Sequence, residues 1–255
     1  MVIFYFSGTG NSQHIARLLA EGLDAECHSI EEGVDFGALM STHDTIGFCY
    51  PVHGSRVPRI MREFTLKHLR FLENKKLILL CTQLIFSGDG SRAFTDMLPR
   101  NYVDVIYAEH IIMPNNVCNL FILPLAKREK QRACVARAEQ QVLKIHGEIK
   151  SGLRRKRGFN LVSRVFGLIQ GVFFPAFERS GLDKVWMDDD CIKCLLCVSL
   201  CPMKNIRFEN NRLITKANCT ICCRCINACP EKAIAIFFRT KVKKQYEGVE
   251  VVFRD

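Results

Sequence analysis

The chain has 255 residues, 48% of them hydrophobic and 24% charged, which excludes a globally disordered protein and suits one large domain or two modest ones. Residues 191–255 contribute +7 of the net charge of +10, an excess that suits nucleic acid, an anionic membrane or an acidic protein, or that offsets bound anionic cofactors. The sequence shows neither a secretory leader nor about 18 consecutive apolar residues, so we expect a cytoplasmic protein without a membrane-spanning helix.

The first 150 residues alternate apolar runs with amphipathic stretches. Strands are predicted at 2–6, 44–49, 77–82 and 103–112, with a weaker one near 25–30. Helices are predicted at 11–22, 57–69, 90–98 and 127–150, with a weaker one near 35–40. This alternation predicts a doubly wound α/β domain over residues 1–150, whose five parallel strands lie in the order 2-1-3-4-5.

The first strand runs into Ser7-Gly8-Thr9-Gly10-Asn11-Ser12 and then into a helix. Glycines permit a tight turn, and the helix N-terminus offers free N–H groups and a favourable dipole to a phosphate. A Walker loop would need a lysine, and a dinucleotide fingerprint would need a third glycine where Gln13 stands. The pattern indicates a monophosphate cradle, with a simple helix cap as the alternative.

Residues 151–182 are predicted to link two domains. The basic run at 154–157 is expected to be solvated, and 161–177 is predicted to be an amphipathic helix. Leu161, Val165, Leu168, Ile169, Val172 and Phe173 share its apolar face. We interpret it as a packing helix that braces two domains, with an interfacial membrane helix as the alternative.

Two copies of one cysteine motif follow, with a period of 28 residues. The first is Cys191-x2-Cys194-x2-Cys197-x3-Cys201-Pro202 and the second is Cys219-x2-Cys222-x2-Cys225-x3-Cys229-Pro230. This spacing is typical of bacterial ferredoxins with two [4Fe–4S] clusters, while a pair of structural zinc sites is the alternative. Cys223 breaks the spacing and is expected to be a packed thiol. Residues 206–215, between the copies, are predicted to form a hairpin.

These motifs carry a resemblance to a known family. Phe6-Ser7-Gly8-Thr9-Gly10-Asn11-Ser12 resembles the FMN phosphate loop of flavodoxins, Ser/Thr-x-Thr-Gly-x-Thr, with Ser12 replacing the last threonine. Joined to the cysteine module, it makes the chain similar to the flavodoxin–ferredoxin fusion proteins of anaerobic bacteria and archaea. The resemblance implies FMN, two [4Fe–4S] clusters, a flavodoxin-like five-stranded sheet and a small α+β ferredoxin-like domain with a basic tail over 183–255.

The resemblance also implies which residues bind the cofactors. In such ferredoxins the fourth cysteine of each motif crosses to the other cluster. Cluster one would therefore be held by Cys191, Cys194, Cys197 and Cys229, and cluster two by Cys219, Cys222, Cys225 and Cys201.

Flavodoxin-like folds hold the isoalloxazine ring with the loops after the third and fourth strands. These loops would be Tyr50-Pro51-Val52-His53-Gly54 and residues 82–90. In the second loop the candidates are Thr82, Gln83, Phe86, Ser87, Gly88, Asp89 and Gly90. Both loops follow the carboxyl ends of strands, where open α/β sheets bind ligands. Tyr50, His53 and Phe86 are the candidates for facing the ring.

We therefore expect an electron-transfer flavoprotein that couples one-electron carriers to a two-electron reaction. The expected partner is a redox protein, either an acidic ferredoxin or an oxidoreductase. A direct reductase of a small organic acceptor, with His53 or Tyr50 as proton donor, is the alternative. A cluster-containing regulator associated with a membrane or with nucleic acid is a further alternative. No nucleic-acid motif accompanies the basic charge, so a nucleic-acid partner is not expected, and peripheral membrane contact is not favoured.

Overall fold

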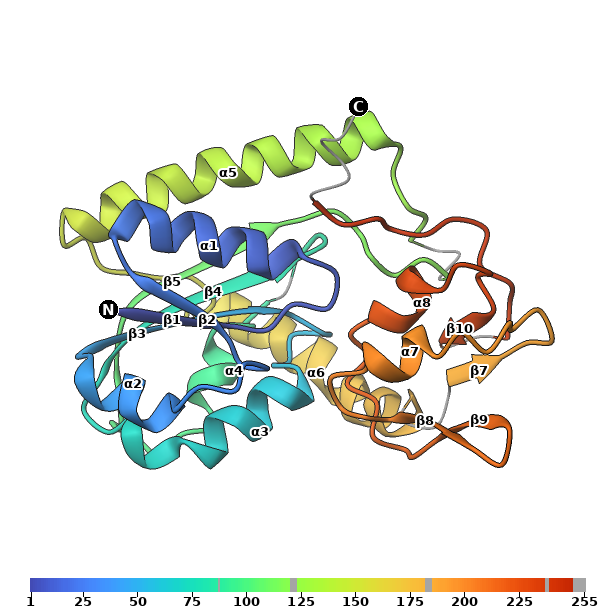
Figure 1. The fold of residues 1–255 in the computed structure, drawn as a ribbon. Helices are drawn as coiled ribbons and strands as arrows, with labels where there is room; N and C mark the ends of the chain where they lie inside the picture. The colour runs from blue at the N-terminus through green and yellow to red at the C-terminus, as the bar shows by residue number, and fades with distance from the viewer. Residues whose placement is uncertain (87, 120–122, 182–184, 237–238, 250–255) are drawn as a thin grey trace. The chain divides into compact units, whose positions relative to one another are not determined.

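A computed structural model of the chain describes residues 1–86, 88–119, 123–181, 185–236 and 239–249, and at 173–177 and 179–181 it describes the backbone alone. The chain forms two compact units (Figure 1). The first comprises Met1–Ser7, Asn11–Met113 and Ala133–Phe174, and the second comprises Gly8–Gly10, Pro114–Arg132 and Pro175–Asp255. The division therefore does not follow the chain, because three loop residues near the N-terminus belong to the second unit.

The first unit is built on a parallel sheet of six strands. They are β1 (Val2–Tyr5), β2 (Glu26–Ser29), β3 (Thr45–Pro51), β4 (Lys76–Gln83), β5 (Asp104–Ile112) and β6 (Arg155–Lys156). Their order is β2-β1-β3-β4-β5-β6, so the predicted order of the first five is confirmed and the predicted number is wrong by one. Every residue of β1 is buried, as expected for a central parallel strand covered on both faces.

Helices cover both faces of this sheet. The described helices are α1 (Asn11–Leu23), α2 (Phe36–Thr42), α3 (Arg59–Lys67), η1 (Leu69–Phe71), α4 (Arg92–Thr95), α5 (Arg128–Lys150) and α6 (Leu161–Gly181). Helices α1 and α5 lie on one side, where His14 meets Glu139 at 2.8 Å, and α2 and α3 lie on the other (Figure 1). On that second side Phe4 of β1 packs against Phe36 and Phe64, with ring centroids 5.7 and 5.9 Å away.

The sixth strand lies in the basic run at 154–157, in which Arg154, Lys156 and Arg157 are exposed, as expected, and Arg155 is half-buried. Glu109 of β5 is buried, and its carboxylate accepts hydrogen bonds from Arg155 at 3.1 Å and from Arg157 at 2.9 Å. Arg155 also donates to Glu148 of α5 at 3.0 Å. A buried carboxylate without a cation is costly, so these ion pairs explain why a basic segment joins the edge of the sheet.

Helix α6 differs from the expectation, because its apolar face is not the face that packs against the protein. Ser163, Gly167 and Gly171 are buried, whereas the side chains of Leu161 and Val172 are 74% and 69% exposed. The interpretation of that face as the packing face is therefore wrong over residues 161–172, and the side chain of Phe173 lies outside the described residues. No helix in the described part of the chain is long and apolar enough to cross a membrane.

The second unit contains two small antiparallel sheets. Strand β7 (Val185–Met187) pairs with β10 (Ile234–Ile236), and β8 (Ile206–Glu209) pairs with β9 (Arg212–Thr215). The second pair confirms the predicted hairpin, and Asn210 and Asn211 have the positive φ angles, 50° and 59°, that a type I′ turn requires. The short helices α7 (Leu196–Ser199) and α8 (Arg224–Ala228) each contain one motif cysteine.

The 28-residue repeat of the sequence is also a repeat of the backbone. Residues that are 28 positions apart share the left-handed conformation. The pairs are Lys193 and Ile221 (54° and 58°), Leu195 and Cys223 (60° and 59°), and Lys204 and Lys232 (48° and 54°). Cys223 therefore occupies the position of Leu195, directly before a short helix, and not the position of a motif cysteine.

Candidate functional site

In the first unit, the residues that flank the loop after β1 are buried. Ser7 follows β1, and Asn11 and Ser12 begin α1. The Oγ atom of Ser12 lies 2.8 Å from the Oγ1 atom of Thr82 near the end of β4. This contact joins the N-terminus of a 13-residue helix to the carboxyl edge of the sheet, the place where open α/β sheets bind ligands and where helix N–H groups favour an anion.

The two candidate ring loops are bonded to each other. The backbone N–H of Val52 donates to the carbonyl of Thr82 at 2.9 Å. His53 and Arg56 exchange backbone hydrogen bonds of 3.1 and 3.0 Å around Gly54 and Ser55. Gly54 and its neighbour Ser55 have φ angles of 54° and 60°, so this loop is a tight turn. Pro51, the last residue of β3, leads into it.

Tyr50 supports the second loop from inside the protein. Its ring is fully buried and stacks on Phe94, with centroids 5.7 Å apart. Its hydroxyl donates to the carbonyl of Gly90 at 3.1 Å. Burial raises the pKa of Tyr50 well above its usual range. Tyr50 therefore positions Gly90, and of the aromatic candidates it is Phe86 that is exposed, by 46%.

The loop at 82–90 holds two buried oxygen atoms that accept no hydrogen bond from any described residue. They are Oε1 of Gln83 and Oδ1 of Asp89. Burial raises the pKa of the Asp89 carboxyl, although Arg56 and Arg92 oppose the shift. Ser87 lies outside the described residues. An oxygen of this kind fits a ligand that brings an N–H or O–H donor to the loop.

His53, the remaining titratable candidate, is half-buried in the first loop. Burial and the nearby Arg62 guanidinium lower the pKa of His53 to about 4. A second histidine, His110 on β5, lies behind the second loop, with its Nε2 atom 2.7 Å from Oγ of Ser91. Burial, with a contribution from Arg157, lowers the pKa of His110 to about 4. Both imidazoles are therefore neutral at pH 7.

Helix α6 lies directly on the two ring loops, a contact that the sequence analysis missed. A Cβ atom at Gly167 would overlap the carboxylate of Asp89, and one at Gly171 would overlap the guanidinium of Arg56. The rings of Phe86 and Phe166 meet edge to face at 5.6 Å. The spacing of the two glycines, four residues apart on one helix face, was the available signal for a close approach of backbones.

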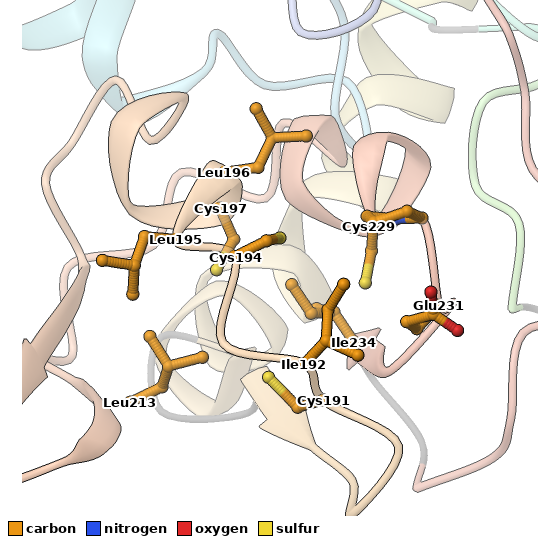
Figure 2. Close-up of a pocket in the computed structure, with 11 residues that line it drawn as sticks. Cys191, Ile192, Cys194, Leu195, Leu196, Cys197, Leu213, Cys229, Glu231 and Ile234 are labelled. Atoms are coloured by element: carbon orange, nitrogen blue, oxygen red, sulfur yellow. The ribbon is translucent and has the colours of Figure 1, made fainter.

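In the second unit, the cysteines line two cavities with about 340 Å³ of empty space each, counting the part open to solvent. Figure 2 shows the first, where three cysteines of the first motif and the last cysteine of the second face one space. These are Cys191, Cys194, Cys197 and Cys229. The second cavity is lined by Cys201, Cys219, Cys222 and Cys225, together with Cys223. The structure therefore brings together each set of four that the ferredoxin resemblance implies.

Backbone N–H groups point at several of these sulfurs. Cys201 accepts from Asn205 at 3.2 Å, and Cys229 accepts from Ala233 at 3.3 Å, so the two crossing cysteines have matching donors. Cys219 accepts from Ile221 at 3.3 Å. Such bonds favour the charged thiolate and tune the potential of a metal bound to it.

Without a bound metal, burial favours the protonated thiol at Cys219 and Cys222. Burial raises the pKa of Cys219 to about 11 and that of Cys222 to about 12. A metal would reverse this balance, because a coordinated thiol is deprotonated. Among the described residues, no group of three or more His, Cys, Asp or Glu side chains is gathered tightly enough to hold a single metal ion.

The loop residues Gly8, Thr9 and Gly10 pack within the second unit. The carbonyl of Gly8 accepts from Nε of Arg224 at 3.2 Å, and Oγ1 of Thr9 accepts from Nδ2 of Asn116 at 2.9 Å. Neither Arg224 nor Asn116 was among the candidates, because no local pattern connects residues so distant in sequence. Gly10 has a φ of +93°, which only glycine adopts without strain.

Comparison with known proteins agrees with the fold described for the first unit. Residues 2–121 match the model of the Flavodoxin domain family. The N-terminal part of the chain is therefore a flavodoxin-like α/β domain built on a parallel sheet. The comparison with curated proteins returned no match.

The solved structures to which this chain is similar include several flavodoxins. Two-electron reduced flavodoxin from Megasphaera elsdenii is 19% identical, covering 55% of this chain and 99% of its own, with a TM-score of 0.39. General stress protein 14 from Treponema denticola, solved with FMN, is 13% identical, covering 57% and 96%, with a TM-score of 0.40. A WrbA-like flavodoxin from Agrobacterium tumefaciens is 16% identical, covering 59% and 97%, with a TM-score of 0.38.

Proposed function

We propose that the chain is an electron-transfer iron–sulfur flavoprotein that binds FMN and two [4Fe–4S] clusters. The observation that carries the proposal is the crossed arrangement of the cysteines. Each cavity is lined by three cysteines of one motif and the fourth cysteine of the other, as in two-cluster ferredoxins. When bound, the clusters carry single electrons and FMN accepts one or two, which joins one-electron carriers to a two-electron reaction.

The residues at the two cavities fit iron–sulfur clusters better than zinc. A structural zinc ion gathers four ligands around one centre, whereas a cube takes one thiolate at each of four iron corners. The sulfurs around each cavity are not gathered for a single ion. Apolar residues such as Ile192, Leu195 and Ile234 complete the first cavity. An apolar lining of this kind lowers the polarity of the surroundings of a bound cluster.

Residues of the first unit fit a flavin phosphate and ring. The loop leads from β1 to the N-terminus of α1, where N–H groups and the hydroxyl of Ser12 suit a phosphate. Oε1 of Gln83 is buried beside the ring loops and accepts no hydrogen bond from a described residue, so it suits an N–H donor of the ring. In this proposal Gln83 and Thr82 orient the flavin, and the loop after β1 holds its phosphate.

The carrier interpretation is favoured over a direct reductase. The reductase alternative needs His53 or Tyr50 as a proton donor. The pKa of His53 is lowered to about 4, so at pH 7 it is a neutral imidazole, which is a far weaker acid than the imidazolium ion. Tyr50 is fully buried, and its hydroxyl proton is engaged by the carbonyl of Gly90.

The proposed partner is an acidic one-electron carrier such as a ferredoxin. Two clusters and FMN would each add a charge of about −2, which would lower the net charge of +10 to about +4. A groove lined by Trp186, Lys232, Arg239 and Lys241 shares Ile234 with the first cysteine cavity. The guanidinium of Arg239 lies 5.7 Å from the centroid of the Trp186 ring. Basic side chains beside cluster one suit the docking of an acidic carrier.

An anaerobic reductive titration tests the proposal. We expect the purified chain to take up about four electrons, one for each cluster and two for FMN, followed by visible absorbance and by electron paramagnetic resonance. Flavin-free protein is the control, and it should take up about two electrons. Flavin that stays oxidised while an excess of electrons reaches the clusters would contradict the proposal.

A further inference from the structure

Within the second unit, Gly8 packs against the loop of cluster two. A Cβ atom at Gly8 would overlap the carbonyl oxygen of Cys222. The φ angle of Gly8 is not in the left-handed region, so backbone conformation alone does not require glycine there. The close approach to Cys222 does require it. One residue of the candidate phosphate loop is therefore fitted to one ligand residue of cluster two.

Arg224 connects the same loop to both sides of the second cavity. Its Nε atom donates to the carbonyl of Gly8 at 3.2 Å, and its Nη1 atom donates to the carbonyl of Leu200 at 3.1 Å. Arg224 lies between Cys222 and Cys225 in the chain, and Leu200 directly precedes Cys201. One guanidinium thus fixes Gly8 relative to segments that carry three of the four ligands.

A second set of hydrogen bonds runs through two asparagines. Asn116 donates from Nδ2 to Oγ1 of Thr9 at 2.9 Å. Its own carbonyl accepts from Nδ2 of Asn227 at 2.8 Å, and that amide also donates to the carbonyl of Cys223 at 2.8 Å. Asn227 belongs to α8, the helix that carries Cys225. The side chain of Thr9 is therefore held by the cluster-two segment as well.

These contacts belong to only one of the two repeats. At a spacing of 28 residues, Arg224 and Asn227 correspond to Leu196 and Ser199 of the first motif. Neither of these has the side chain that makes the bonds described above. The cysteine motif itself does not require Arg224 or Asn227, since the first copy folds with leucine and serine. The second copy thus has a feature that the ligand set does not explain.

We propose that cluster two and FMN bind cooperatively, through the contact of Gly8 and Thr9 with the cluster-two loop. This proposal rests on the proposed function. Ligation of the second cavity fixes the segment from Cys219 to Ala228, and that segment fixes the backbone of the phosphate loop before the cofactor arrives. Preorganisation of a binding loop lowers the cost of binding. Because coupling is reciprocal, FMN must in turn stabilise cluster two.

The test is an anaerobic titration of flavin-free, iron-loaded protein with FMN, followed by quenching of flavin fluorescence. Arg224→Leu and Asn227→Ser, made together, place the residues of the first repeat in the second and leave every cysteine in place. We expect this variant to retain its iron and to bind FMN about tenfold more weakly, within the usual range of 5–150-fold for coupled sites. Its iron should also be released to a chelator faster when FMN is present, relative to wild type.

A matched cysteine pair provides the second measurement. Cys225→Ser and Cys197→Ser are equivalent substitutions in the two repeats and remove a ligand from cluster two and cluster one respectively. We expect weaker FMN binding in the first variant and nearly unchanged binding in the second. Equal FMN affinity in both, with the double variant also at the wild-type value, would overturn the coupling. Absence of FMN or iron from the wild-type chain would overturn the proposed function itself.

Discussion

Replacing Gly167 by alanine is expected to destabilise the first unit, although the same change usually stabilises a helix. Gly167 lies in α6 and is buried against the loop that holds Asp89. An added methyl group would overlap the Asp89 carboxylate. That carboxylate is itself buried, so it cannot turn into solvent without moving the loop.

Two opposing effects decide the sign. Alanine gains about 1 kcal/mol over glycine in a helix interior. Forcing a methyl group into a packed site costs about 1–3 kcal/mol. Moving Asp89 would also expose its buried carboxyl to solvent or remove it from its present contacts. We expect the packing cost to win, with a net loss of about 1–2 kcal/mol of unfolding free energy. For a unit of this size this lowers the midpoint of thermal unfolding by roughly 2–8 °C.

Gly147→Ala is the matched control. Gly147 is exposed in α5, and a Cβ atom there would have no neighbour within 4 Å. It should raise stability by up to about 1 kcal/mol. Far-UV circular dichroism follows the helices of the first unit, while Trp186, the one tryptophan in the sequence, reports on the second. A Gly167→Ala variant as stable as Gly147→Ala would refute the packing of α6 on the Asp89 loop.

Three further predictions concern the cysteines, the buried histidine and the basic groove. Cys197→Ser and Cys225→Ser should each lower the iron content by about four per chain, while Cys223→Ser should leave it unchanged in elemental analysis. The pKa of His110 is lowered to about 4 in the folded state, so the contribution of its neutral imidazole to the free energy of unfolding is fully present above pH 6.5. That contribution is lost as the pH falls towards 4. The loss should approach about 3 kcal/mol in the wild type and should be smaller in His110→Gln, measured by urea unfolding at several pH values. An unfolding free energy that falls equally steeply with pH in both proteins would contradict this prediction. Arg239→Glu should slow reduction by an acidic ferredoxin at low salt and weaken the salt dependence in stopped-flow kinetics, whereas an unchanged rate would remove the groove from the docking surface.

Much of the first unit could be predicted from local patterns. Apolar runs and helical periodicity identified β1 to β5 and their order, because these signals arise within each element. Strand β6 has two residues, Arg155 and Lys156, and its place depends on the distant carboxylate of Glu109. Likewise, periodicity shows which residues of α6 share a face, but it does not show which face the protein covers.

Part of the candidate site could likewise be predicted from local sequence, and part of it could not. The repeated cysteine spacing lies within a short segment and carries the resemblance to two-cluster ferredoxins, and that resemblance implies the two sets of four that line the cavities. The contacts of Gly8 with Arg224 and of Thr9 with Asn116 join residues that are distant in sequence. No spacing rule relates such residues. The local sequence signal for these contacts is that the two repeats differ at Arg224 and Asn227.

The most direct test of the central claim is the content of iron, acid-labile sulfide and flavin in protein purified without oxygen. The proposed function predicts about eight irons, about eight sulfides and one FMN for each chain. Iron and sulfide without flavin would leave the cysteine cavities as cluster sites and remove FMN from the loop after β1. Zinc without sulfide would contradict the electron-transfer function altogether.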